Sequence, residues 1–284
     1  LQVHCRGQRY GAGLTSHVAR SEREVDLFRP RECIWFGRPD QAPAMAGMHE
    51  PVPRLEFLDE AAVRARVPVI RRGYLHGGLL DCEGGDLDVE ALLRGYLKLF
   101  RRSGGDLRLD HRVTVLEPSA EGWAVTAGDA RFTAPVVVNA AGAWAEQVGE
   151  WAGLAPLGIR PLRRTALTID APAGLDIDDW PEMVDIDETF YFKPDAGLIL
   201  ISPADETPSE PCDAQPEEWD VAMGVHRFEQ ATGLVREAII VAPVARIPMI
   251  SAPGCALVSR RSRRWPAPTA TYTNSAARLP SEAT

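Results

Sequence analysis

Apolar and polar positions repeat along the chain with two different periods, and these periods predict its helices and strands. The clearest helical pattern follows Asp88, where apolar residues recur every three or four positions as far as about residue 102. Asp88 is a suitable N-cap, and Gly104-Gly105 ends the pattern. Two more helices are predicted, over residues 59–66 and 216–233.

Strands are predicted where short apolar or alternating runs lie between turn residues. The strongest hairpin pattern joins 190–193 to 198–201 through Pro194-Asp195-Ala196-Gly197, with the glycine late in the turn. Further strands are predicted over residues 34–37, 113–116, 123–126, 136–138 and 165–169, and we expect the valines of 136–138 to be buried. Helices and strands alternate in the first half, whereas strands dominate the second. We therefore predict a mixed α/β (α+β) fold, in which an α/β domain is interleaved with an antiparallel-sheet domain.

Composition and charge narrow the class of protein. Hydrophobic residues make up 45% of the chain and charged residues 25%, which excludes collagen, coiled coil and wholesale disorder. No run approaches the roughly 18 apolar residues of a membrane span. The net charge is −9, with 24 basic and 38 acidic residues up to residue 234, but seven Arg and two Glu over 235–284. An acidic body repels nucleic acid and anionic membranes, so we expect a small-molecule substrate.

Metal and nucleophile motifs are weak. The five cysteines are widely spaced and form no C-x-x-C pair, which predicts no zinc site and favours reduced thiols in a cytoplasmic protein. The acidic residues between Asp81 and Asp88 lack the spacing of a calcium loop, so helix caps and solvated turns are expected there. Neither an H-E-x-x-H pair nor a G-x-S-x-G elbow is present. We therefore assign no metal ligand and no catalytic side chain.

Gly11-Ala12-Gly13 partly matches the glycine-rich turn that binds dinucleotides. The third glycine of the G-x-G-x-x-G pattern is replaced by Ser16, and the preceding residues 6–10 are polar instead of forming a buried strand. Because the pattern works only between a strand and a helix, we do not assign a phosphate cradle here.

The strongest local signal is the run from Val136 to Trp144, which reads Val-Val-Val-Asn-Ala-Ala-Gly-Ala-Trp. An apolar strand is predicted to end in small residues and to continue into a helix. Small residues at such a point let a ligand reach backbone amides, and a helix N-terminus favours a phosphate. The same residues also permit tight packing of a strand on a helix. The residues alone do not decide between these two interpretations.

This run resembles the flavin-proximal motif of the D-amino-acid oxidase family of FAD-dependent oxidoreductases, which includes glycine oxidase, sarcosine oxidase and D-amino-acid dehydrogenases. Other features of that family follow in order over about residues 34–234, and they are Gly77-Gly78-Leu79-Leu80, Asp86-Leu87-Asp88, Gly104-Gly105, Val113-Thr114-Val115, Pro161-Leu162-Arg163-Arg164, Tyr191-Phe192-Lys193-Pro194 and 202–206. The resemblance implies FAD as cofactor. It also implies oxidation of the C–N bond of a D-amino acid or secondary amine by hydride transfer to the flavin.

The resemblance also implies functional positions. Val113 would contact the cofactor through its backbone, and the flavin side of the cleft would be lined by Ala140, Ala141, Gly142 and Trp144. Tyr191 and Lys193 would lie on the substrate sheet and face the flavin ring. The alternatives are that Tyr191 packs its ring as an ordinary strand residue and that Lys193 is a solvated lysine on an edge strand.

The same resemblance suggests the domain organisation. We expect an atypical segment over 1–33, an FAD-binding α/β part with interleaved substrate-domain strands over 34–158, an antiparallel-sheet substrate domain over 159–234 and a basic, proline-rich tail over 235–284. Neither the family's G-x-G-x-x-G unit nor its C-terminal flavin segment, which carries a carboxylate-binding arginine, is evident. We interpret the chain as truncated at both ends, with a non-native or disordered tail. The alternative function is a non-catalytic remnant that binds no flavin.

The tail interpretation makes a prediction about proteolysis. Because the apolar residues of 235–284 show no sustained period and are interrupted by prolines, this segment should be cut first when the protein is treated briefly with trypsin. Mass spectrometry of the early fragments checks this. A tail that survives while other parts of the chain are cut would contradict it.

The absent phosphate cradle makes a second prediction, which concerns FAD affinity. Each charge-assisted hydrogen bond contributes about 1.5–3 kcal/mol net, and each 1.4 kcal/mol is roughly a tenfold change in affinity. Losing about four such bonds would cost at least about four orders of magnitude. We therefore expect the chain to bind FAD weakly or not at all and to show negligible turnover, which an FAD titration followed by flavin fluorescence can measure.

Overall fold

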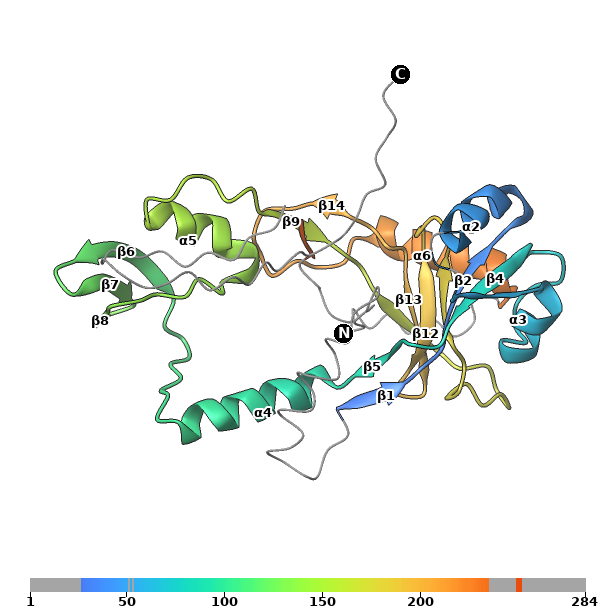
Figure 1. The fold of residues 1–284 in the computed structure, drawn as a ribbon, viewed down its shortest axis with the longest axis horizontal. Coiled ribbons are helices and arrows are strands. Elements are labelled where there is room, and N and C mark those ends of the chain that lie inside the picture. Colours follow the sequence, from blue (N-terminus) through green and yellow to red (C-terminus); the bar gives the residue numbers. More distant parts are fainter. Residues whose placement is uncertain (1–26, 51, 53, 235–248, 252–284) are drawn as a thin grey trace, which may run out of the picture. The chain divides into compact units, whose positions relative to one another are not determined.

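The computed structural model describes residues 27–50, 52, 54–234 and 249–251, and these divide into two compact units (Figure 1). The first unit contains the described residues up to Leu107, Arg164–Asp205 and the described residues 215–234. The second contains Arg108–Arg163, Glu206–Ala214 and the short strand Met249–Ser251. Each unit is therefore assembled from separate stretches of sequence.

The first unit is built from strands and five helical segments. Its strands are β1 (Phe28–Pro30), β2 (Cys33–Gly37), β3 (Glu56–Leu58), β4 (Gly77–Asp81), β5 (Gly85–Leu87), β10 (Leu167–Asp170), β11 (Glu182–Asp185), β12 (Tyr191–Asp195) and β13 (Leu198–Ser202). Its helical segments are the 3₁₀ turn η1 (Pro39–Gln41), α2 (Ala42–His49), α3 (Glu60–Arg66), α4 (Val89–Arg102) and α6 (Glu218–Thr232). The helices predicted over 59–66, after Asp88 and over 216–233 are confirmed.

Seven of these strands form one sheet in the order β10-β13-β12-β11-β2-β4-β3. All neighbours in this sheet are antiparallel except β11 and β2, which are parallel and pair Glu182 with Cys33. The sheet thus joins three strands from early in the chain to four strands from late in the chain. This finding confirms a mixed fold that contains a large, mainly antiparallel sheet.

Apolar side chains cover both faces of the seven-stranded sheet. On one face, α3 and α6 pack against alternate strand residues, and the fully buried members include Ile34, Phe36, Val63, Phe192, Ile199, Ile201 and Phe228. On the other face, Met45 of α2 packs against Trp35 and Leu79. Because strand side chains alternate between faces, β2, β4, β11 and β12 contribute to both clusters.

The ribbon of β1 and β5 leads directly into α4. The Asp88 carboxylate accepts a hydrogen bond from the Ala91 N–H at 2.8 Å, which confirms the predicted N-cap. Leu93 and Phe100 on the predicted apolar stripe of α4 are exposed within the described structure. The period of the pattern was therefore sufficient to predict the helix, although packing does not bury its apolar face.

The second unit contains two small sheets and one short helix. Its elements are β6 (Val113–Ser119), β7 (Gly122–Ala127), β8 (Ala130–Ala134), the 3₁₀ turn η2 (Gly142–Trp144), α5 (Ala145–Trp151), β9 (Arg160–Arg163), β14 (Thr207–Pro208) and β15 (Met249–Ser251). Strands β6, β7 and β8 form an antiparallel meander, and β9 lies between β14 and β15. The strands predicted over 113–116 and 123–126 are confirmed as parts of β6 and β7.

The predicted buried strand over 136–138 is wrong in this structure. The segment is irregular, and Val136 and Val138 are 47% and 78% exposed. Among the residues that the structure describes, no strand pairs with this segment, so its backbone lacks the ladder of hydrogen bonds that defines a strand. The three valines therefore have high β propensity, but among the described residues they have no neighbouring strand with which to pair.

Several sequence predictions concern other parts of the chain. The Gly11-Ala12-Gly13 turn lies outside the described residues, as does most of the predicted tail over 235–284. The exception in the tail is β15, which pairs antiparallel with β9 where we expected no regular packing. Within the part of the chain that the structure describes, none of the helices has the length and apolar character needed to cross a membrane.

The predicted hairpin is confirmed and has a two-residue turn. Asp195 pairs with Leu198, which leaves Ala196 and Gly197 as the turn residues, with φ values of 51° and 81°. Two positive φ values match the type I′ turn that suits the twist of paired strands. Gly197 adopts this conformation without strain, whereas the Cβ of Ala196 makes it unfavourable.

Replacing Ala196 with Asn should stabilise the protein by up to about 1 kcal/mol, because Asn tolerates the left-handed conformation better than Ala. Urea unfolding followed by circular dichroism measures the change. Ala196→Val is the matched control and should destabilise, since β-branched residues are poorly accommodated at positive φ. An Asn variant that is no more stable than the Val variant would contradict this account of the turn.

Candidate functional site

The Ala-Ala-Gly-Ala-Trp run forms a tight turn that leads into α5. The Asn139 side chain holds this turn: its Nδ2 donates to the Ala145 carbonyl at 2.8 Å, and its Oδ1 accepts from the Ala141 N–H at 3.3 Å. Gly142 has a φ of 56°, a left-handed conformation that glycine adopts without steric strain. At the other side of α5, the Glu146 carboxylate accepts hydrogen bonds from the Leu157 and Ile159 amides.

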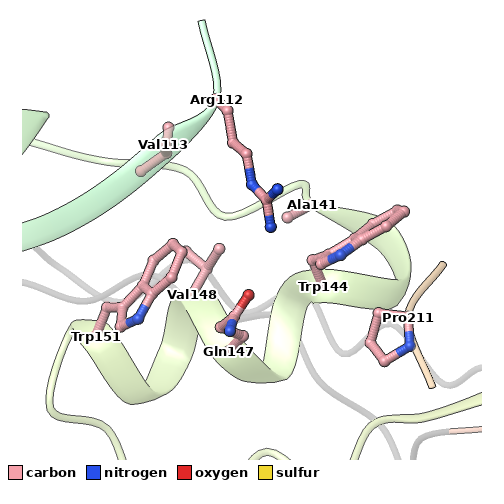
Figure 2. Close-up of a pocket in the computed structure, with 8 residues that line it drawn as sticks. All are labelled: Arg112, Val113, Ala141, Trp144, Gln147, Val148, Trp151 and Pro211. Carbon is pink, nitrogen blue, oxygen red and sulfur yellow. The ribbon is translucent and has the colours of Figure 1, made fainter. Parts of the chain in front are cut away.

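A hollow of about 570 Å³ opens beside this turn within the second unit (Figure 2). It is lined by Arg112, Val113, Ala141, Trp144, Gln147, Val148, Trp151 and Pro211. Most of these side chains are apolar, and two are indoles. The set contains one cation and no carboxylate, so the hollow suits a ligand with flat apolar surfaces and negative charge.

Two local features position the lining residues. The register of β6 against β7 shifts between Val113 and Val115, and such a bulge redirects the side chains beside it. Trp144, Gln147, Val148 and Trp151 lie at positions i, i+3, i+4 and i+7, and therefore on one side of the helical segment. Figure 2 shows this side of α5 facing the start of β6, with Arg112 extending into the space between them.

The structure brings together three of the five residues predicted to bind the cofactor. Val113, Ala141 and Trp144 line the same hollow, although 28 residues separate Val113 from Ala141 in sequence. Ala140 is exposed and Gly142 is half-buried, and neither lines the hollow. For these two residues the cofactor role stays a prediction without support from the hollow.

Sequence reasoning missed Arg112, Gln147, Val148 and Trp151 as lining residues. The helical spacing from Trp144 to Trp151 was available as a signal for the three residues on α5. Arg112 had no such signal, because its place in the hollow depends on the bulge in β6 and on the packing of α5 beside that strand.

The two predicted substrate residues lie in the first unit, two positions apart on the same face of β12. The ring of Tyr191 packs against the cluster that contains Trp35 and Met45, as the packing interpretation expected. Burial raises the pKa of Tyr191, although the neighbouring Ser202 hydroxyl and the positive charge of Arg164 oppose this shift. The phenol therefore stays protonated at neutral pH and can donate a hydrogen bond.

Lys193 does not lie on an edge strand, so the solvated-edge interpretation is wrong. Strand β12 lies between β13 and β11, and the Lys193 side chain is only 13% exposed. Its Nζ is 2.6 Å from Oδ1 of Asp86. The sequence left an edge position open for Lys193 because it carries no pattern that reveals the pairing of β12 with β11. Strand β11 covers that side of β12 and is separated from it by a turn.

Asp86 binds a second cation. Its Oδ2 lies 2.5 Å from Nε of Arg31, whose side chain is 7% exposed. Arg31 in turn donates to the carbonyl of Asp178 at 3.0 Å and to the carbonyl of Trp180. Partial burial raises the pKa of Asp86, but Lys193 and Arg31 outweigh that effect and the pKa lies below its ordinary value. We call Arg31, Asp86 and Lys193 the ion triad.

Cys33 lies on the same face of the sheet as Lys193 and offers no nucleophile. Burial, followed by the charges of Glu182 and Asp81, strongly raises the pKa of its thiol. None of the described cysteines, Cys33, Cys82 and Cys212, forms a disulfide. Within the described residues, the first unit therefore offers hydrogen-bonding and charged groups instead of a thiolate.

The acidic residues between Asp81 and Asp88 act separately. Asp88 caps α4 as expected, and Asp81 accepts from the Glu83 N–H and pairs with Arg54. Asp86 differs from the prediction of a solvated turn carboxylate, because it lies in the ion triad and is only 24% exposed.

Comparison with known proteins identifies the class to which this fold belongs. A family model described as FAD dependent oxidoreductase matches residues 7–246. The chain belongs to this family of FAD-dependent oxidoreductases. The match extends beyond the range 34–234 that carried the resemblance in the sequence, and it includes the segment around Gly11 and Gly13.

Individual relatives agree with this class. The chain is 27% identical over 119 residues to monomeric sarcosine oxidase from Streptomyces avermitilis and 29% identical over 110 residues to N-methyl-L-tryptophan oxidase from Citrobacter koseri. These alignments cover 40% and 39% of this chain but only 31% and 28% of the two relatives. The crystal structure of glycine oxidase from Geobacillus kaustophilus has a similar fold, with a TM-score of 0.68 at 18% identity, over 82% of this chain and 62% of that chain.

The residues of the hollow are compatible with the family's cofactor. FAD carries flat ring systems and two phosphates, which require apolar surfaces and positive charge, respectively. Trp144, Val148 and Trp151 offer the apolar surfaces, and Arg112 offers the charge. The donor set therefore fits an aromatic nucleotide.

Replacing Asp86 with Asn should lower the free energy of unfolding by about 3 kcal/mol near neutral pH, because two mostly buried cations lose their shared anion. The pKa of Asp86 lies below its ordinary value of 3.8, so its contribution is present above pH 3.8 and is lost as the pH falls through the lowered pKa. Urea unfolding of both proteins should show a constant difference above that pH and a narrowing difference below it.

Glu90→Gln is the matched control, since it removes one negative charge from the exposed pair with Arg94. Its effect should be about 0.5 kcal/mol or less. Equal effects of the two substitutions would show that the ion triad contributes no more than a surface pair.

Proposed function

We propose that this chain is the core of an FAD-dependent oxidoreductase that oxidises the C–N bond of a small amino acid, either a secondary amine or a D-amino acid. Family membership over residues 7–246 supports the cofactor and the type of reaction. The relatives are named for sarcosine and N-methyl-L-tryptophan, and similar structures are titled glycine oxidase and L-proline dehydrogenase. These compounds share a C–N bond next to a carboxylate, which is the substrate chemistry that we propose here.

The observation that carries the proposal is the convergence at the hollow. Val113 and the pair Ala141 and Trp144 come from separate stretches of sequence, and the family resemblance alone implies that they contact FAD. They line one cavity of suitable chemistry. A fold unrelated to this family would have no reason to bring these three residues to the same hollow.

The chemistry can be divided between cofactor and protein. Bound FAD supplies a two-electron acceptor for the hydride on the substrate carbon next to nitrogen. Loss of that hydride and of the N–H proton converts the amine to an imine, which water hydrolyses. Side chains of this chain would then bind and orient the substrate and exclude water. We assign Tyr191 and Lys193 to substrate binding, with Tyr191 as a hydrogen-bond donor and Lys193 held in place by Asp86.

The second candidate function is a non-catalytic remnant that binds no flavin. Two observations favour it. The sequence has Ser16 where the phosphate cradle needs its third glycine, and the segment 136–138 has no strand partner among the described residues. Both observations lower the expected affinity for FAD without changing the family to which the chain belongs.

Anaerobic reduction of flavin separates the two functions. The protein is mixed with excess FAD and with sarcosine, N-methyltryptophan or a D-amino acid, and the flavin absorbance is followed. The oxidoreductase proposal predicts slow bleaching that depends on both protein and substrate, because weakly bound flavin exchanges with the excess. FAD and substrate without protein are the control.

An absorbance that stays constant with every substrate, in a sample that contains bound FAD, would contradict the oxidoreductase proposal. A protein that binds no FAD at millimolar concentration is the result expected of the remnant. Tight, saturable binding would instead show that residues 1–33 supply a phosphate cradle, contrary to the prediction from sequence.

A further inference from the structure

Arg112 is the only charged residue among those that line the hollow. Its side chain is exposed, and the described part of the structure gives it no ion pair or hydrogen bond. Figure 2 shows its guanidinium extending between the start of β6 and the helical segment that carries Trp144 and Gln147. A strong donor group thus points into a mostly apolar cavity without a protein acceptor among the described residues.

The surroundings of Arg112 favour an anion over a neutral ligand. Guanidinium groups bind phosphates with two parallel hydrogen bonds, and such charge-assisted bonds strengthen where apolar walls exclude water. The lining contains no carboxylate that would compete for the guanidinium or repel an anion. Gln147, on α5, also lines the hollow and adds an amide that can donate a further hydrogen bond.

The two indoles define the rest of the ligand. Trp144 and Trp151 lie seven positions apart and both line the hollow. Indole rings offer flat surfaces on which aromatic rings pack, and such contacts contribute about 0.5–1.5 kcal/mol beyond the burial of area. A ligand that uses both features has an aromatic ring system linked to a phosphate, which is the chemistry of a nucleotide.

We propose that Arg112 binds a phosphate of a flavin or adenine nucleotide whose rings pack in the hollow beside Trp144 and Trp151. This inference rests on the proposed function for the identity of the nucleotide as FAD, and it adds a residue that neither the family motif nor the resemblance assigned. Arg112 then supplies part of the phosphate binding that the sequence around Gly11 and Gly13 does not offer.

The test compares three ligands that differ in their phosphates. FAD and ADP carry two phosphates, whereas riboflavin has the flavin ring and none. The seven tryptophans are labelled, and the indole N–H signals are followed by NMR during titration, with Trp144→Phe and Trp151→Phe used to assign the two signals from the hollow. This readout detects millimolar binding and requires no enzymatic activity.

The substitution Arg112→Gln should weaken binding of FAD and ADP about tenfold and leave riboflavin binding changed by less than about twofold. Arg112→Lys keeps the charge but loses the planar fork, so it should recover part of the lost affinity. Arg160→Gln removes the same charge from β9, outside the residues that line the hollow, and should leave all three affinities unchanged.

The outcomes separate this inference from the proposed function. Equal FAD affinity in the native protein and in Arg112→Gln would overturn the role of Arg112 and leave the flavin proposal standing. Binding of ADP that depends on Arg112, without binding of FAD or riboflavin, would support the phosphate site and overturn the flavin function. An equal loss of riboflavin and FAD affinity in Arg112→Gln, or no indole shift with any ligand, would overturn the inference.

Discussion

The first unit depends on the ion pairs of the Asp86 carboxylate, because they join parts of the chain that lie far apart in sequence. It bridges Arg31, just before β2, and Lys193, on β12, and Arg31 continues the connection to the carbonyls before β11. Three charged groups that are mostly withdrawn from water are favourable only as a set, since each one alone would carry a desolvation penalty. The ion triad therefore specifies which segments meet, in addition to the apolar clusters that supply most of the burial.

The hollow of the second unit depends on local backbone geometry and not on ion pairs. Asn139 replaces missing backbone partners at the turn before α5, and a bulge sets the start of β6 apart from its ladder. The Asn139 bonds stabilise a turn outside regular structure, and the bulge interrupts the β6–β7 ladder. Local irregularity of this kind is common beside binding sites, because backbone groups in the interior of a helix or sheet are already paired with one another. The small residues of the motif serve this geometry, with Ala143 and Ala145 buried and Ala141 at the hollow.

The sequence was sufficient where a feature depends on neighbours along the chain. The Asp88 cap of α4 and the turn at Ala196-Gly197 followed from a few adjacent residues, and the family followed from an ordered series of short motifs. It was insufficient where strand pairing decides the outcome. The valines of 136–138 carry the composition of a buried strand but have no partner among the described residues, and Lys193 looked like an edge lysine because the pairing of β12 with β11 is not visible locally. The ion triad and the place of Arg112 in the hollow depend on tertiary contacts in the same way.

The parallel pairing of β2 with β11 has a consequence for how the protein is made. Cys33 and Glu182 pair across this junction although they are about 150 residues apart in the chain. At a synthesis rate of ~5–20 residues per second, a ribosome needs ~8–30 s to produce that length. During this interval the nascent β2–β4–β3 half of the sheet has an open edge at β2, and Ile34 and Phe36 lack the later strands that cover them. The chain therefore passes through a period in which a molecular chaperone, or a non-native strand, can bind the edge before its own partner emerges.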